Sequence, residues 1–166
     1  VIHLFVRAEH GGPAQPVLDA ISRFTATEPN QVIVSSVLGG RADLGFMCLS
    51  PDLDALDRLV KEVLAGPVER LDSFVSVTEN SEYTTTEAEE RVRLEASGEA
   101  DVDGTLSTWR ERMAHYIDAR LHPRLPQKRF ICFYPMSKSR IPGANWFGLS
   151  FDERKALMRG HATTGR

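Results

Sequence analysis

The hydrophobic pattern of the first half of the chain changes repeatedly between strand-like and helix-like stretches. Runs of consecutive or alternating apolar residues predict strands over residues 1–7, 31–37, 44–49 and 71–77. Apolar residues at helical spacing predict two helices, one carrying Val17, Leu18, Ile21 and Phe24, the other carrying Leu53, Leu56, Leu59, Val60, Val63 and Leu64. The resulting order β-α-β-β-α-β is that of a split βαβ, ferredoxin-like unit, an α+β fold with two helices on one face of an antiparallel sheet.

Turn and cap residues support this order. Gly39-Gly40 separates the two middle strands and predicts a hairpin. Ser50-Pro51 predicts the start of the second helix, with the serine as its cap, and Gly66 marks its end.

Residues 79–103 are markedly acidic. Nine acidic residues stand against Arg91 and Arg93, which gives this segment a net charge of -7. Such a composition favours a solvated or mobile connector, with a short helix possible around residues 86–95. A docking tail for a basic partner is the alternative interpretation.

The second half begins with a helical stripe of Leu106, Trp109, Met113, Ile117 and Leu121, which stops before Pro123 and Pro126. Residues 130–134 predict a fifth strand, and Ser150 with Glu153 forms a capping-box signature for a helix that continues to about Gly160. A strand and a helix would open a second ferredoxin-like unit but could not cover their own apolar face. We therefore expect the remaining strands to come from another chain, a cleaved remainder or a further segment.

We accordingly divide the chain into a first ferredoxin-like unit (1–78), an acidic connector or insertion (79–105), a connecting helix with a proline-rich turn (106–127) and an incomplete second unit (128–166).

Composition narrows the possibilities. A chain of 166 residues with 42% hydrophobic content can bury a sizeable core, and a net charge of -3 argues against general nucleic-acid binding. Cys48 and Cys132 both lie in apolar runs without metal-ligand spacing, so we expect buried free thiols in a reducing cytoplasm. No membrane span or signal peptide is evident in the sequence, which favours a cytoplasmic protein.

Candidate chemistry gathers near the end of the chain. On an extended segment Tyr134, Met136 and Lys138 would share one face, and His161 follows Leu157 and Met158 on the apolar side of a helix. Taken singly, Tyr134 is more often a core tyrosine, Lys138 a solvated amine and His161 a helix-terminal side chain. The spacing of the other histidines selects none of them as a metal ligand.

Several spaced motifs occur together: LGGRADLGFM (38–47), SFVSVTENSEY (73–83), ARLHPRLP (119–126), CFYPMSK (132–138), NW, an ER..LM helix and H...GR. This combination resembles the coproheme decarboxylases of the chlorite dismutase superfamily over nearly the whole chain except residues 84–105. The resemblance implies the first of two tandem units of the dimeric α/β-barrel type, an iron porphyrin (coproheme or haem b) and a homopentamer.

The resemblance also assigns roles. Tyr134 matches a redox tyrosine that attacks a propionate as a radical, and His161 matches the proximal iron ligand. Lys138 matches the lysine beside the reacting propionates, Arg120 a propionate-binding arginine and Met136 a pocket wall. Tyr83 matches a second propionate-contacting tyrosine.

The expected activity is oxidative decarboxylation of two propionates of iron coproporphyrin III by hydrogen peroxide, which yields haem b in bacterial haem biosynthesis. Arg and Lys at the rim suit its carboxylates. Alternatives are a chlorite dismutase, which converts chlorite to chloride and dioxygen, a non-catalytic haem carrier or sensor, and an inactive fragment without the distal pocket.

Overall fold

The computed structural model describes the backbone of residues 1–164 and the side chains of residues 1–160. The chain divides into two compact units. Unit 1 comprises residues 1–79 and 118–127, and unit 2 comprises residues 80–117 and 128–166.

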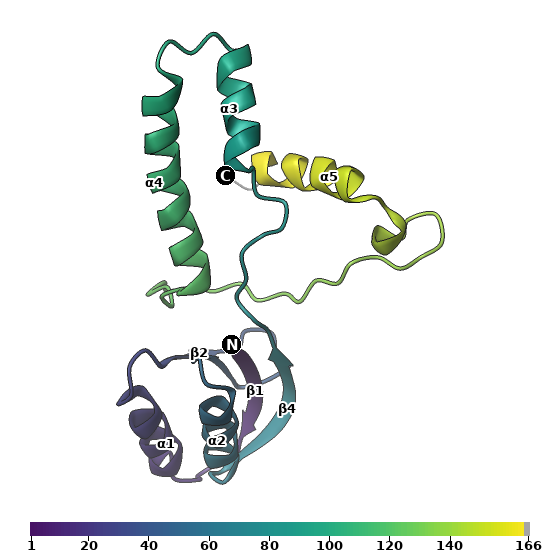
Figure 1. Ribbon diagram of the computed structural model, residues 1–166. Helices are drawn as coiled ribbons and strands as arrows, with labels where there is room; N and C mark the ends of the chain where they lie inside the picture. The colour runs from purple at the N-terminus through teal and green to yellow at the C-terminus, as the bar shows by residue number, and fades with distance from the viewer. Residues whose placement is uncertain (165–166) are drawn as a thin grey trace. The chain divides into compact units, whose positions relative to one another are not determined.

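Unit 1 is a four-stranded sheet with two helices on one face (Figure 1). Its elements are β1 (Ile2–Ala8), α1 (Gln15–Thr25), β2 (Gln31–Ser36), β3 (Leu44–Leu49), α2 (Leu53–Leu64) and β4 (Val68–Val75). The strand order is β2-β3-β1-β4, and every neighbouring pair is antiparallel. The predicted α+β, ferredoxin-like arrangement is therefore confirmed.

The core of unit 1 lies between the sheet and the helices. Leu4 and Val6 of β1 and Phe46 of β3 are at most 2% exposed, because alternate residues of each strand face α1 and α2. Leu56 and Val63 of α2 are equally buried among them. Burial of these apolar side chains is what stabilises the helix layer on the sheet.

The β2-β3 hairpin turns where the sequence indicates. Gly39 and Gly40 have φ angles of 98° and 73°, which non-glycine residues rarely adopt. The backbone N–H of Val37 then donates to the carbonyl of Asp43, which closes the loop.

Two element boundaries differ from the sequence-based expectation. The cap of α2 is Asp52, whose side chain accepts a hydrogen bond from the Asp54 backbone, whereas the Ser50 hydroxyl accepts one from the Asp52 backbone. Strand β4 begins at Val68 and ends at Val75, earlier than the predicted 71–77, because Val68 pairs with Ala8 and Val75 with Ile2. An irregularity in this pairing between Phe5 and Val6 obscures the strand's alternation in the sequence.

Unit 2 contains helices α3 (Glu87–Ala96) and α5 (Phe151–Thr164), a 3-10 turn η1 (Trp146–Gly148) and most of α4 (Val102–Leu121). Helices α3 and α4 lie side by side (Figure 1), joined by ion pairs of Glu87 with Arg110 and of Arg91 with Asp103. The acidic segment thus holds the short helix that its pattern allowed.

The apolar stripe of α4 is only partly buried. Leu106 is fully buried, while Trp109, Met113 and Ile117 are half-buried and Leu121 is 37% exposed. Leu94 of α3 is 3% exposed and provides the second buried leucine of unit 2.

The predicted fifth strand over residues 130–134 was wrong. These residues have no regular secondary structure, because a strand exists only where a neighbouring strand takes its backbone hydrogen bonds. For the same reason Cys132 is exposed, against the expectation of burial, whereas Cys48 in β3 is buried as expected.

Candidate functional site

An aromatic cluster in unit 2 brings together two of the predicted site residues. The ring of Tyr83 meets Trp146 edge-on, with centroids 6.1 Å apart, and stacks on Phe151 at 5.5 Å. The Lys138 ammonium lies 4.3 Å from the centroid of the Trp146 ring, a cation-π distance. Tyr83 and Lys138 therefore contact the same tryptophan, although 55 residues separate them in the sequence.

The loop between Lys138 and Trp146 is closed by local hydrogen bonds. The Trp146 backbone N–H donates to the Ser139 carbonyl at 2.9 Å, and the Asn145 side chain accepts from the Phe147 backbone at 3.1 Å. A second cation-π contact, with Arg140 4.0 Å from the Phe147 ring centroid, lies beside the first. These contacts restrain Lys138 and Arg140 without pairing either cation with a carboxylate.

Tyr83 remains a neutral phenol at ordinary pH. A hydrogen bond with the Glu82 side chain is the main cause that raises the pKa of Tyr83 above its usual value, and partial burial adds to it. The backbone N–H of Tyr83 donates to the Ser81 hydroxyl, which fixes the turn that presents the ring. The single O–H of Tyr83 thus already has a carboxylate partner, Glu82.

Tyr134 and Met136 lie on an exposed segment. Their exposed fractions are 68% and 78%, and Phe130 and Ile141 on the same segment are 71% and 69% exposed. Tyr134 is therefore not a core tyrosine in this chain. Apolar side chains so exposed together are unusual unless a ligand or another chain covers them.

The sequence on both sides of Tyr134 is rich in cationic residues. Between Ala119 and Phe151 the sequence has no Asp or Glu, and its cations are Arg120, Arg124, Lys128, Arg129, Lys138 and Arg140. A flat apolar ligand that carries several carboxylates requires this combination of exposed apolar and cationic side chains. On this chemistry, the residues present fit a propionate-bearing porphyrin.

Arg120 belongs to unit 1. Its Nε donates to the Glu79 carbonyl at 3.3 Å, and the Thr78 hydroxyl donates to the Leu121 carbonyl at 3.2 Å. The residues that follow are held by Gln31, whose side chain donates to the Pro123 carbonyl at 3.2 Å and accepts from the Leu125 backbone at 2.9 Å. The sequence analysis did not identify Gln31. Its two backbone partners lie 92 and 94 positions further along the chain, so no local pattern indicates these bonds.

His161 falls within α5, and its side chain lies outside the described residues. The predicted capping box at the start of α5 is confirmed: the Glu153 carboxylate accepts from the Ser150 backbone and hydroxyl, both at 2.8 Å, and the Glu153 backbone donates to that hydroxyl. These bonds, the backbone one first, lower the pKa of Glu153. The local sequence thus fixes where the helix bearing His161 begins.

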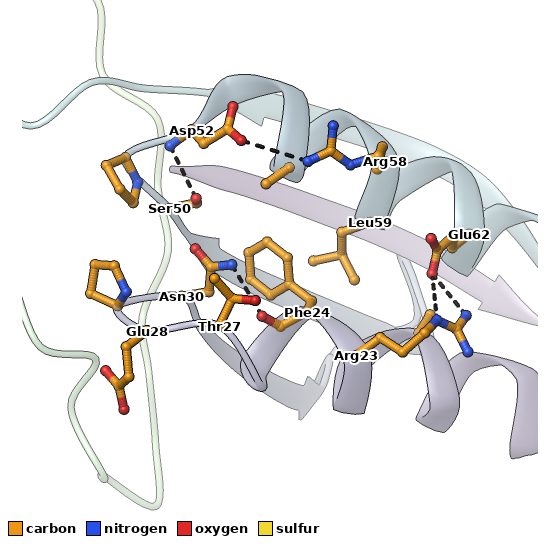
Figure 2. A pocket seen from close by; sticks show the side chains of 14 residues that line it. Arg23, Phe24, Thr27, Glu28, Asn30, Ser50, Asp52, Arg58, Leu59 and Glu62 are labelled. Atoms are coloured by element: carbon orange, nitrogen blue, oxygen red, sulfur yellow. Dashed lines mark hydrogen bonds and ion pairs between the residues drawn. The ribbon is translucent and has the colours of Figure 1, made fainter.

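A cavity of about 330 Å³ opens in unit 1, on the side of the sheet that carries the helices (Figure 2). Phe24 and Leu59 form its apolar part, and the ion pairs Arg23–Glu62 and Arg58–Asp52 lie at its edge. None of the five predicted site residues whose side chains the structure describes lines it.

Among the side chains of residues 1–160, no group of three His, Cys, Asp or Glu is placed to hold a metal ion. None of the helices in this part of the chain is sufficiently long and apolar to cross a membrane.

Fold and site together define an α+β protein in which a ferredoxin-like unit precedes a cationic, aromatic-rich segment. The family model described as chlorite dismutase matches residues 14–166. The chain belongs to the chlorite dismutase family.

Three relatives, each named "Putative heme-binding protein", come from haloarchaea. The one from Haloarcula marismortui is 41% identical over 153 residues, which is 90% of this chain and 21% of that protein. Those from Natronomonas pharaonis and Haloquadratum walsbyi are 39% and 36% identical, over 80% and 84% of this chain and 21% and 24% of theirs. The chain spans between a fifth and a quarter of the length of these relatives.

Proposed function

We propose that this chain forms part of a haem site and that the protein decarboxylates coproheme with hydrogen peroxide. The observation that carries the proposal is the exposed segment without acidic residues in which Tyr134 and Met136 lie among six cations. The names of the haloarchaeal relatives support haem binding, and the CFYPMSK motif supports the decarboxylase.

Arg120 and Lys138 would bind the propionates. A guanidinium binds a carboxylate through two parallel hydrogen bonds, whereas an ammonium is a movable point charge. Lys138 rests against Trp146, and no ion pair joins its ammonium to a carboxylate among the described side chains, so we propose that its charge receives the ligand. The hydroxyl of Tyr83, whose single proton is engaged by the Glu82 side chain, would reach a propionate only by exchanging that partner.

Tyr134 would be the reactive group of the chain. Oxidation of a protonated phenol to a phenoxyl radical releases a proton together with an electron. Lys138 follows Tyr134 by four residues in the sequence, and we propose that its amine donates and accepts protons beside the phenol. Met136 would form part of the wall against the macrocycle.

His161 would bind the iron through an imidazole nitrogen. When bound, the iron porphyrin supplies the redox chemistry, and the protein supplies orientation and exclusion of side reactions. For each propionate, the substituent CH2CH2COOH and one H2O2 give a vinyl group, CO2 and two water molecules, so atoms and electrons balance.

The partners of residues 128–150 are a further part of the proposal. This segment forms no strand, yet it carries exposed Phe130, Tyr134 and Met136. We propose that strands from another chain or a further segment complete this second unit, and that the protein assembles as a homo-oligomer, a pentamer by family resemblance. A cytoplasmic location also remains a prediction.

Two other functions remain in view. Haem binding without turnover accords with the relatives' names, and chlorite dismutation accords with the description of the family model. A carrier would bind porphyrin but leave peroxide unused, and a dismutase would release dioxygen from chlorite.

The first experiment is titration of the chain with iron coproporphyrin III, followed by absorbance. We expect saturable binding with a shift of the main porphyrin band, lost in His161→Ala and retained in His115→Ala, a matched change at an exposed histidine of α4. Equal binding by both variants would contradict iron ligation by His161.

A further inference from the structure

Helix α3 lies in the acidic segment of residues 79–103, and one of its carboxylates makes contacts in two directions. Glu89 completes the capping box at the start of the helix. Its Oε2 accepts hydrogen bonds from the Thr86 backbone at 2.8 Å and from the Thr86 hydroxyl at 3.1 Å, while its own backbone donates to that hydroxyl. One oxygen of the carboxylate is thus committed to the helix terminus.

The other oxygen binds helix α5. Oε1 of Glu89 accepts a hydrogen bond from Nζ of Lys155 at 2.5 Å. The Lys155 side chain is only 14% exposed, whereas that of Glu89 is 47% exposed. The hydrogen bond from Lys155 is the main cause that lowers the pKa of Glu89 to about 2, with the Thr86 bonds next.

Such a pair is unlike an ordinary surface ion pair. Exposed ion pairs contribute little, because water solvates both charges when they separate. The Lys155 side chain is mostly covered, so an ammonium that loses its carboxylate partner has little access to water in place and is expected to move. Lys155 and the start of α5 should therefore shift when Glu89 is neutralised.

The start of α5 continues into the candidate site. Lys155 Nζ lies 6.0 Å from the centroid of Phe151, and Phe151 stacks on Tyr83. Tyr83 in turn meets Trp146, on which Lys138 rests. An unbroken series of side-chain contacts thus leads from Glu89 to the two site residues Tyr83 and Lys138, and the same helix holds His161. Within unit 2, α5 approaches the N-terminal end of α3 (Figure 1).

We propose that Glu89 is a positioning residue of the haem site: through Lys155 it fixes helix α5 and the Tyr83–Trp146–Lys138 cluster in the arrangement that receives the porphyrin. The acidic segment is then a structural part of the site rather than a spacer. The role in ligand binding rests on the proposed function, whereas the positioning of the cluster does not.

The test compares Glu89→Gln with Glu87→Gln. Both changes neutralise one carboxylate of α3, but Glu87 pairs with Arg110 of α4, whereas it is Glu89 that pairs with Lys155 of α5. Glutamine at the capping-box position still accepts from the helix terminus, so α3 should persist, which far-ultraviolet circular dichroism checks. The first readout needs no porphyrin: Trp109→Phe leaves Trp146 as the sole tryptophan, and its emission reports on the cluster.

In this background we expect Glu89→Gln and Lys155→Met each to shift the Trp146 emission, and Glu87→Gln to leave it unchanged. The second readout is the Kd for iron coproporphyrin III, which Glu89→Gln should raise about fivefold. Lys155→Arg keeps the positive charge, so both readouts should stay close to those of the parent. The double variant Glu89→Gln with Lys155→Met should differ little from either single variant.

Equal effects of Glu89→Gln and Glu87→Gln on the Trp146 emission would overturn the proposal, and so would additive effects of the Glu89 and Lys155 changes. If the parent chain binds no porphyrin, the proposed function fails, while the Trp146 emission still decides whether Glu89 positions the cluster.

Discussion

The glutamine that holds the segment after Arg120 offers a quantitative test. The Gln31 side chain makes two partly buried hydrogen bonds, to the backbone of Pro123 and of Leu125. A hydrogen bond of this kind contributes about 1 kcal/mol, so Gln31→Ala should lower the free energy of opening of this segment by about 2 kcal/mol. That corresponds to a roughly thirtyfold higher population of the open state.

Limited proteolysis measures this population, because cleavage of a transiently open segment follows the opening equilibrium when closing is fast. Trypsin cleaves after Arg124, which lies between the two hydrogen-bonded residues. We expect cleavage there to accelerate about thirtyfold in Gln31→Ala.

The control is Gln15→Ala. Gln15 donates to Asp19, one turn along its own helix α1, so its loss should leave the cleavage rate at Arg124 unchanged. The reasoning is refuted if Gln31→Ala leaves the rate unaltered, or if both variants raise it equally.

Three further predictions concern stability and reactivity. Leu56→Ala should lower the free energy of unfolding by about 2–5 kcal/mol in urea titrations followed by circular dichroism. Leu53 is 62% exposed on the same helix, so Leu53→Ala should lower it far less, and similar losses would contradict the core assignment. Iodoacetamide at pH 8 should alkylate the exposed Cys132 rapidly and Cys48 only on unfolding, since burial raises the pKa of Cys48 to about 12. Mass spectrometry measures the two alkylation rates, and comparable rates would disprove this. The pKa of Glu89 is lowered to about 2, so the stabilising contribution of its carboxylate is present above the usual carboxyl range and is lost as pH falls from about 4.5 towards 2. Acid titration of the Trp146 emission should show this loss in the parent and not in Glu89→Gln.

The elements that sequence reasoning placed well are those with local signals. Helix α5 starts at its capping box, and the two helices of unit 1 follow their apolar spacing, because caps and amphipathic faces are encoded within a few residues. The ferredoxin-like order followed from the succession of such elements.

The predictions that were wrong share one cause: the structure at those positions depends on residues that are distant in the sequence. The boundaries of β4 are set by pairing with β1, and residues 130–134 have the composition of a strand without a neighbouring strand to pair with. The contact of Tyr83 with Trp146 and the bonds of Gln31 join residues far apart in sequence, so no periodicity reveals them. The six site residues came from family motifs, and the structure joins two of them, Tyr83 and Lys138, through one tryptophan.

The central claim is that Tyr134 reacts with a propionate of a bound iron porphyrin. The direct measurement is the mass of the porphyrin after stepwise addition of hydrogen peroxide to the protein loaded with iron coproporphyrin III, compared among wild type, Tyr134→Phe and the control Tyr116→Phe. We predict that wild type and Tyr116→Phe lose two carboxyl groups as CO2 and form haem b, while Tyr134→Phe leaves the substrate intact. Unchanged substrate with all three proteins, or haem b from Tyr134→Phe at the wild-type rate, would contradict the account.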